Sequence, residues 1–295
     1  MKEIRTIGVL GTGQMGSGIA QVAAAAKFEV TARDLHEDQL AQGRKAIEKS
    51  LGKFVEKGKF PSAERDAALG RIRYTTRLED LAGSDLVIEA VTEDLETKNR
   101  LWTALDGVCP PETLFASNTS SLSIMAMATV TSRPERFLGL HFFNPVPMMP
   151  LVEVVRSIAT SREAIEAGTA FVRRLGKEPV LARDSAGFIV NLLLIPYLLD
   201  AVRAVERGVA SVADIDTGMK LGCGHPMGPL TLLDFVGLDT ACKVGQILYE
   251  EFREARYAPP PLLKRMVLAG WYGKKSGKGF YDWSVTPAAP SELGL

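Results

Sequence analysis

Short apolar runs alternate with longer amphipathic stretches along the first part of the chain. The first run, residues 4–10 (Ile-Arg-Thr-Ile-Gly-Val-Leu), has the β-branched, apolar composition of a buried strand. Similar runs follow at residues 28–32, 72–75, 85–91, 113–117, 137–142, 151–155 and 178–182. Helical patterns separate several of them, at residues 14–26, 36–58, 95–105 and 163–175. Strands that alternate with helices predict an α/β fold built on a doubly wound sheet.

The pattern changes after residue 182. From Gly187 onward no run predicts a strand, and helical patterns are interrupted by Gly and Pro at residues 222–229 and 259–261. We therefore expect residues 1–185 to form the sheet domain and residues 186–295 to form an all-helical C-terminal domain. The Pro- and Ala-rich residues 284–295 predict a loose tail.

A glycine pattern follows the first strand directly. Its loop consists of Gly11, Thr12, Gly13, Gln14, Met15 and Gly16. The first glycine permits a tight turn, the second lets the backbone approach a pyrophosphate, and the third lets the next helix pack on the strand. Asp34 ends the second strand about 20 residues further on, where a carboxylate accepts hydrogen bonds from a ribose. This order predicts a Rossmann-type dinucleotide site. The alternative is a glycine-rich turn without a ligand.

Asp34 also indicates which dinucleotide is bound. A 2′-phosphate beside this carboxylate would bring like charges together at a cost of about several kcal/mol, so NAD is favoured. Arg33 keeps NADP open, because an arginine at this position can hold that phosphate. If the strand persists, however, the side chains of Arg33 and Asp34 point in opposite directions.

Composition and charge argue against several classes of protein. Lys plus Arg and Asp plus Glu number 35 each, so no net charge attracts nucleic acid or an anionic membrane. The scattered Cys109, Cys223 and Cys242 form neither a zinc spacing nor a disulfide framework. The first strand begins too early for a signal peptide, and the Ala-rich residues 22–26 are too few to span a bilayer. We expect a cytoplasmic protein without a metal site.

Three histidines narrow the search for a general base that works near neutral pH. His36 begins a solvated helix, and His225 lies in a turn rich in Gly and Pro. His141 instead ends an apolar strand where the chain leaves the sheet, and Glu153 on the next strand is within reach of it. A carboxylate there orients the imidazole and stabilises its protonated form. The alternative is two residues that are hydrogen-bonded independently at the sheet edge.

Two polar clusters follow other strands. Residues 117–121 (Ser-Asn-Thr-Ser-Ser) bring hydroxyls and amides to the cofactor edge of the sheet, or merely cap the next helix. Residues 89–94 (Glu-Ala-Val-Thr-Glu-Asp) precede Lys98, and acids there also suit a helix N-terminus. On the pattern alone, capping is the better interpretation of the first cluster.

Several longer motifs stand in order along the chain. They are residues 117–122 (Ser-Asn-Thr-Ser-Ser-Leu), 136–147 (Arg-Phe-Leu-Gly-Leu-His-Phe-Phe-Asn-Pro-Val-Pro), 187–191 (Gly-Phe-Ile-Val-Asn), 222–230 (Gly-Cys-Gly-His-Pro-Met-Gly-Pro-Leu) and 277–282 (Gly-Lys-Gly-Phe-Tyr-Asp). Together they closely resemble the L-3-hydroxyacyl-CoA dehydrogenase family, and the short bacterial 3-hydroxybutyryl-CoA dehydrogenases are the most similar members. The resemblance extends from Ile7 to about Trp283.

The resemblance implies an NAD-dependent oxidoreductase that interconverts a short (S)-3-hydroxyacyl-CoA and its 3-ketoacyl-CoA, bound between the two domains. His141 is then the catalytic base, Glu153 its partner, and Ser120 and Asn191 the residues that bind the reacting oxygen. Glu93, Lys98, Ser120 and Asn144 would contact the nicotinamide half of NAD, and Lys53 and Lys57 the CoA phosphates. From the residues alone, the two lysines are a solvated face and Asn191 is an unremarkable helix residue.

Three positions depart from the family pattern: Leu192 replaces a common Arg, Asp200 a frequent Glu, and Arg33 beside Asp34 is less usual. The resemblance also implies a homodimer through the helical domain, which suits apolar runs such as residues 192–199, although a well-filled core would explain them too.

Two other functions stay open. One is a lambda-crystallin-like dehydrogenase of a free hydroxy acid or sugar acid, against which Lys53 and Lys57 argue. The other is a non-catalytic dinucleotide-binding protein, against which the complete set of Ser120, His141, Glu153 and Asn191 argues.

Overall fold

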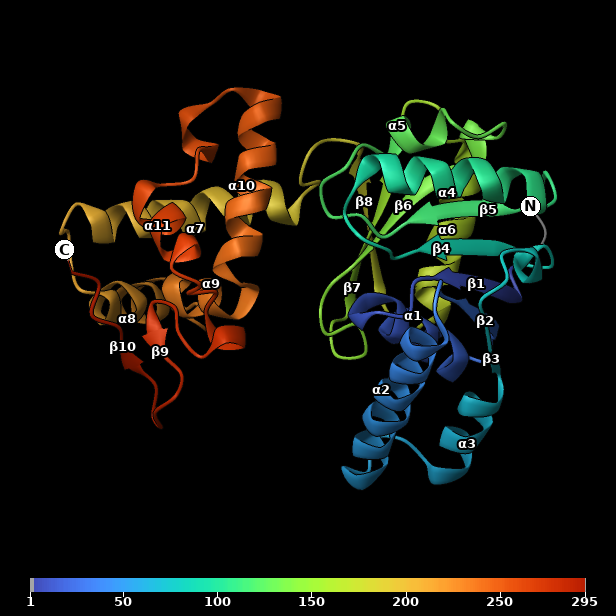
Figure 1. The fold of residues 1–295 in the computed structure, drawn as a ribbon, viewed down its shortest axis with the longest axis horizontal. Coiled ribbons are helices and arrows are strands. Elements are labelled where there is room, and N and C mark those ends of the chain that lie inside the picture. Colours follow the sequence, from blue (N-terminus) through green and yellow to red (C-terminus); the bar gives the residue numbers. More distant parts are fainter. Residues whose placement is uncertain (1–2, 295) are drawn as a thin grey trace. The chain divides into compact units, whose positions relative to one another are not determined.

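The computed structural model describes residues 3–294. The chain folds into two compact units, Met1–Phe188 and Ile189–Leu295 (Figure 1). The first unit contains a large sheet, and the second consists mainly of helices. The sequence analysis placed the division between residues 185 and 186.

The sheet of the first unit has, among the described residues, eight strands in the order β3-β2-β1-β4-β5-β6-β7-β8. They are β1 (Thr6–Leu10), β2 (Glu29–Arg33), β3 (Ile72–Thr75), β4 (Leu86–Glu89), β5 (Leu114–Ser117), β6 (Phe137–Phe142), β7 (Leu151–Arg156) and β8 (Glu178–Arg183). Neighbouring strands are parallel except β6 and β7, which are antiparallel. The chain runs outward from β1 to β2 and β3, then crosses to β4 on the other side of β1. Ligands of such sheets bind beyond the carboxyl ends of the strands at this crossing point.

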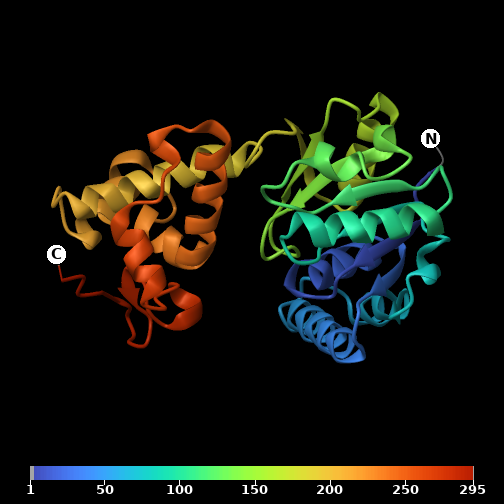
Figure 2. The same ribbon diagram turned by 45° about the horizontal axis from the view of Figure 1, so that its top comes forward.

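Helices cover both faces of this sheet (Figures 1 and 2). On one face lie α1 (Gln14–Ala25), α2 (Glu37–Glu56), α3 (Ser62–Gly70) and α6 (Arg162–Arg174), and on the other α4 (Leu95–Val108) and α5 (Ile124–Ala128). Short 3-10 helices at Glu79–Leu81 and Pro134–Arg136 complete the unit. The expected doubly wound α/β fold is confirmed.

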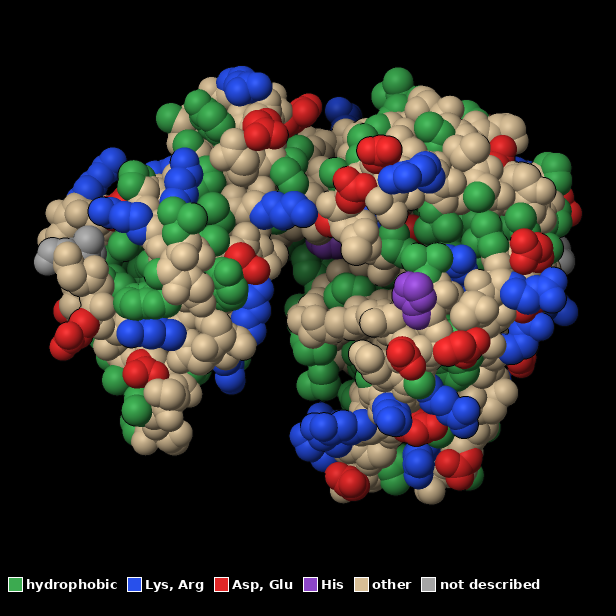
Figure 3. All heavy atoms as spheres, in the orientation of Figure 1, with side chains coloured by type: hydrophobic (Ala, Val, Ile, Leu, Met, Phe, Trp, Pro, Cys, Tyr) green, Lys and Arg blue, Asp and Glu red, His purple; other side chains and the backbone are tan. Residues whose placement is uncertain are grey.

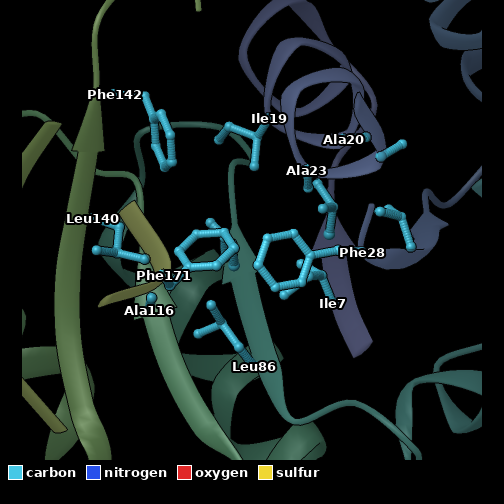
Figure 4. Close-up of a cluster of buried hydrophobic side chains, with 14 of the residues drawn as sticks. Ile7, Ile19, Ala20, Ala23, Phe28, Leu86, Ala116, Leu140, Phe142 and Phe171 are labelled. Carbon is cyan, nitrogen blue, oxygen red and sulfur yellow. The ribbon is translucent and has the colours of Figure 1, made fainter. Parts of the chain in front are cut away.

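The core of the first unit forms where apolar helix faces meet the sheet. Figure 4 shows Ala23 of α1 close to Phe28 and Ile7 of β1, with Ile19 of α1 above them and the ring of Phe171 of α6 tilted against that of Phe28. The rings of Phe28 and Phe171 have centroids 5.2 Å apart. Each fully buried Ile or Phe side chain stabilises the fold by roughly 1.5–3 kcal/mol, so this packing fixes α1 and with it the end of β1.

The second unit contains α7 (Val190–Glu206), α8 (Val212–Cys223), α9 (Pro229–Val236), α10 (Leu238–Phe252) and α11 (Pro261–Leu268), with 3-10 helices at Ala255–Tyr257 and Lys274–Ser276. The helical prediction is confirmed with one correction: β9 (Tyr281–Asp282) and β10 (Ala289–Pro290) form a small antiparallel ladder. Two-residue strands leave no alternating pattern in a sequence, which is why they were not predicted.

The side chain of Asp234 holds the first strand of this ladder in place. The buried carboxylate of Asp234 accepts hydrogen bonds from the amides of Phe280 and Tyr281, both at 2.9 Å, and from Trp283 Nε1 at 2.8 Å. The amide of Ser291 then donates to the Phe280 carbonyl at 2.9 Å. The expected loose tail is therefore partly wrong, because residues 289–291 pair with the segment that Asp234 holds.

Candidate active site

The turn after β1 has the conformation that its glycines make possible. Gly11 has φ +88°, and a Cβ there would lie 2.7 Å from the Ala90 carbonyl oxygen. A Cβ on Gly16 would lie 1.8 Å from the Gly11 carbonyl oxygen, so α1 reaches β1 only because this residue is glycine. Gly13 is different, because no atom lies within 4 Å of its missing Cβ. That open side gives a phosphate access to the backbone.

The first residues of α1 are Gln14 and Met15, and Gly13 precedes them without a side-chain cap. The amides of this helix N-terminus have no acidic side chain in the first turn to accept from them. A helix N-terminus of this kind favours an anion such as a pyrophosphate. The glycine loop therefore fits the phosphates of a dinucleotide.

Asp34 lies beside this loop. One carboxylate oxygen accepts from the Thr12 amide at 2.6 Å and the Thr12 hydroxyl at 2.9 Å, and the other accepts from the Leu35 amide at 2.7 Å. Arg33 points elsewhere, as expected, and its Nε donates to the Thr76 carbonyl at 3.1 Å. A carboxylate, and not a guanidinium, is thus the charged group at the ribose position, which fits NAD.

His141 and Glu153 face each other across the antiparallel pair of β6 and β7. His141 Nδ1 lies 2.6 Å from Glu153 Oε2, and the exposed fractions of the two residues are 6% and 0%. A proton shared with this carboxylate sits on Nδ1, so Nε2 is the nitrogen that can accept another. The rings of Phe143 and Phe188 pack on the imidazole, with centroids 4.5 and 5.7 Å away.

Ser120 lies on the loop that follows β5. Its amide donates to Glu93 Oε1 at 3.0 Å, and the Thr119 hydroxyl donates to the same oxygen at 2.5 Å. The N-cap of α5 is Ser123, whose hydroxyl accepts from the Ala126 amide at 3.2 Å. Capping therefore does not explain residues 117–121, contrary to the preference from the pattern alone.

Lys98 is 1% exposed and lies between two carboxylates. Its Nζ is 2.5 Å from Glu89 Oε1 and 3.3 Å from Glu93 Oε2. Burial by itself raises the pKa of Glu93, but the Lys98 charge and the hydrogen bonds from Thr119 and Ser120 outweigh it and lower this pKa below its ordinary value. Asp94 caps α4 by accepting from the Thr97 amide, which bears out the helix-start interpretation for that residue.

Asn144 follows β6 on an exposed loop, residues 143–150. Together with Thr12, Gly13 and Gln14 it lines a groove of about 380 Å³ that α2 closes on its far side. Lys177 holds this loop in place, because its Nζ donates to the Val146 and Met149 carbonyls, both at 2.6 Å. Burial lowers the pKa of Lys177. Sequence reasoning missed this residue because no motif marks it.

Three predicted site residues lie on helices and not on the strand ends or loops described above. Lys53 is in the last turn of α2 and Lys57 is its C-cap; both are exposed, and Figure 3 shows Lys and Arg side chains gathered over this helix. Asn191 is in the first turn of α7, in the second unit. Their roles stay predictions.

Within residues 3–294, no group of three or more His, Cys, Asp or Glu side chains is arranged to hold a metal ion. Of the helices described, none has the length and apolarity needed to cross a membrane.

The fold and the glycine loop define a dinucleotide-binding protein of the Rossmann class. Comparison with known proteins makes this more specific. Residues 6–185 match the family model of the 3-hydroxyacyl-CoA dehydrogenase NAD-binding domain, and residues 187–283 match that of the C-terminal domain. The chain therefore belongs to the 3-hydroxyacyl-CoA dehydrogenase family, and the resemblance predicted from its motifs is confirmed.

Individual relatives agree over nearly the whole chain. The 3-hydroxybutyryl-CoA dehydrogenase of Mycobacterium tuberculosis is 51% identical over 282 residues, which cover 95% of this chain and 99% of the relative. The human mitochondrial hydroxyacyl-coenzyme A dehydrogenase is 46% identical, covering 95% and 91%. The crystal structure of (S)-3-hydroxybutyryl-CoA dehydrogenase PaaH1 from Ralstonia eutropha has a TM-score of 0.93 at 43% identity, covering 96% and 100%.

Proposed function

We propose that this protein interconverts (S)-3-hydroxybutyryl-CoA and acetoacetyl-CoA, with NAD as the redox partner and His141 as the general base and acid. The observation that carries the proposal is the buried His141–Glu153 pair, with 2.6 Å between Nδ1 and Oε2. It lies on the sheet that carries the glycine loop and Asp34. The names and the identities of the relatives support the same substrate.

In the oxidation direction, His141 Nε2 accepts the proton of the substrate hydroxyl as the hydride leaves C3. NAD, when bound, supplies the hydride acceptor. Glu153 stabilises the imidazolium that forms and holds the ring in the required tautomer. Positioned proton transfer of this kind contributes a factor of about 10²–10⁴ to the rate. In the reverse direction, the protonated His141 gives its proton to the ketone oxygen.

Other residues bind and orient the reactants. The amides after Gly13 bind the pyrophosphate, Asp34 binds the adenosine ribose, and Glu93, Lys98 and Asn144 line the nicotinamide end. Ser120 and Asn191 donate hydrogen bonds to the reacting oxygen, which holds C3 in position and stabilises developing negative charge.

Lys53 and Lys57 bind the phosphates of CoA. Both side chains are exposed cations at one end of α2, where a phosphate competes only with water and salt. Replacing both with Gln should raise the KM for acetoacetyl-CoA, leave the KM for NADH unchanged and weaken the salt dependence of the former.

The second unit forms a homodimer interface. Leu193, Leu221 and Leu268 of its helices are 64%, 80% and 85% exposed, and a partner subunit would cover such apolar side chains. Sedimentation of the purified protein tests this assignment, and a monomer at micromolar concentration would contradict it. We also place the enzyme in the cytoplasm, where the free thiols of Cys109, Cys223 and Cys242 would stay reduced.

The decisive experiment follows the absorbance of NADH with acetoacetyl-CoA, and repeats it with NADPH and with free acetoacetate. We expect turnover only with the CoA thioester and a clear preference for NADH. Equal turnover of the free acid would favour a lambda-crystallin-like dehydrogenase. Cofactor binding without any turnover would favour a non-catalytic dinucleotide-binding protein.

A further inference from the structure

Glu89 is the last residue of β4 and has no exposed surface. Its carboxylate accepts from Lys98 Nζ at 2.5 Å, from the Ser117 hydroxyl at 2.6 Å and from the Val91 amide at 2.8 Å. The residue therefore joins the ends of β4 and β5 to α4. No part of the mechanism described above uses it.

The position of Glu89 is next to the glycine loop. Leu10 at the end of β1 is its register partner, and a Cβ on Gly11 would touch the carbonyl of the following residue, Ala90. β1 and β4 are the strands on either side of the crossing point of the sheet, beyond whose carboxyl ends ligands bind. A charge at Glu89 is therefore placed to act on a bound dinucleotide.

Glu89 also decides the charge of its cluster. Lys98 contributes one positive charge, and Glu89 and Glu93 contribute two negative charges. Without Glu89, the ammonium of Lys98 and the carboxylate of Glu93 would cancel. With Glu89 as the nearer partner of Lys98, the cluster keeps one net negative charge at the edge where Glu93 holds the amide of Ser120.

We propose that Glu89 is a positioning residue that, by pairing with Lys98, leaves a net negative charge beside the nicotinamide and so favours NAD⁺ over NADH. The proposal rests on the proposed function for the location of the nicotinamide. The oxidised ring carries a positive charge that the reduced ring lacks, so only NAD⁺ gains from this charge. One unit charge at roughly 10 Å, with an effective dielectric constant of about 20–25, changes a binding constant about tenfold.

Charge variants of the cluster test the proposal through cofactor binding alone. Glu89→Gln makes the cluster neutral, and we expect the ratio Kd(NAD⁺)/Kd(NADH) to rise about tenfold. The double variant Glu89→Gln with Lys98→Gln restores a net charge of −1. Loss of the Lys98 side chain from the nicotinamide end should weaken the binding of both cofactors alike, so the ratio should return to that of the wild type. A role in structure alone predicts that the double variant is at least as impaired as the single one. NADH fluorescence gives one constant and displacement by NAD⁺ gives the other.

Asp85 provides a matched control at the opposite end of the same strand. Its carboxylate accepts from the amides of Arg5 and Thr6, both at 2.9 Å. Asp85→Asn removes an equal charge far from the cofactor edge, so the ratio should stay unchanged. Where Glu89→Gln does not fold, Lys98→Gln takes the cluster to −2 and should lower the ratio.

A ratio that is the same in the wild type and Glu89→Gln, or one that the double variant does not restore, would overturn the proposal. Failure of the proposed function looks different: the wild type would bind both cofactors with a measurable ratio but would not turn over acetoacetyl-CoA.

Discussion

Asp234 in the second unit and Glu153 in the first are both carboxylates with at most 1% of their surface exposed, and both take part in hydrogen bonds. Their partners differ. Asp234 accepts from two backbone amides and an indole, none of which titrates near neutral pH. Glu153 is paired with His141, whose second ring nitrogen remains able to accept a proton. In the proposed mechanism, the partner, and not the burial, therefore separates a carboxylate that holds the fold from one that serves chemistry.

The largest expected effect comes from replacing His141, the partner of Glu153. His141→Gln keeps a side chain that can hydrogen-bond to Glu153 but cannot take up the substrate proton. We expect kcat to fall about 10³-fold while the Kd for NADH stays within about twofold. Steady-state kinetics and NADH fluorescence measure the two quantities. An equal loss of both would mean that His141 acts on the fold of the site and would remove the distinction drawn from its partner.

Removing the structural carboxylate should affect stability instead. Asp234→Ala leaves the amides of Phe280 and Tyr281 and the Trp283 indole without their acceptor, at a cost of about 1–3 kcal/mol for each buried group. For a loss of about 3 kcal/mol, we expect the melting temperature of the second unit to fall by roughly 10 °C or more. Calorimetry measures this change. The Kd for NADH should not change, because the glycine loop lies in the first unit.

The sequence predicted only some of the residues that hold the fold and the candidate site. The sheet, the glycine loop and Asp34 followed from patterns that local physics imposes, such as β-branched runs and glycines where a Cβ would clash. The pairing of His141 with Glu153 was also accessible, because the two residues end and begin neighbouring strands. Their spatial contact depends on register, which no short stretch determines.

The contacts that the sequence could not show are those between distant segments. Asp234 holds residues 280–283 from another element, and Lys177 fixes the 143–150 loop through two backbone carbonyls. A backbone acceptor or donor leaves no trace in residue types, so these two roles carry no sequence signal. The interpretation of residues 117–121 as a helix cap was wrong for a related reason. A Ser-rich run suits a cap, and only the structure shows that Ser123 takes this role.

Two glycines allow a third test that separates residues needed for ligand binding from residues needed for folding. Gly13→Ala adds a methyl group with no protein atom within 4 Å, so folding should tolerate it, whereas the pyrophosphate would meet it. We expect the Kd for NADH to rise at least about tenfold with little change in melting temperature. Gly52→Ala is the matched control, because this helical position is equally open and lies outside the cofactor site. If Gly52→Ala also weakened NADH binding, the effect of Gly13→Ala could not be assigned to contact with the pyrophosphate.

Asp234 and Glu93 should also differ in how their contributions to the free energy of unfolding depend on pH. Burial raises the pKa of Asp234 above 3.8 despite its hydrogen bonds, so the folded state binds this proton more tightly than the unfolded chain does. Its contribution to stability therefore falls as pH rises from about 3.8 through the raised pKa. The pKa of Glu93 lies below 4.5, so its contribution is present above 4.5 and is lost as pH falls through the lowered pKa.

Comparing the wild type with the amide variants Asp234→Asn and Glu93→Gln isolates the contribution of each carboxylate to stability. Between pH 3.5 and about 6, the stability of the wild type relative to Asp234→Asn should decrease with rising pH, and that relative to Glu93→Gln should increase. Unfolding by urea at each pH gives the differences. Two curves of the same sign would contradict the assignment of the two groups to different environments.

Asp34 accepts hydrogen bonds from Thr12 and, in the proposed function, also binds the ribose, so it combines both roles. Its replacement gives the smallest expected effect. Asp34→Asn removes the charge that repels a 2′-phosphate, and we expect the NADPH to NADH ratio of kcat/KM to rise about tenfold. Arg33→Ala should change that ratio less than about twofold, because the guanidinium donates to the Thr76 carbonyl and points away from Asp34. A clear loss of NADPH use in Arg33→Ala would show that this arginine turns toward the phosphate when the cofactor binds.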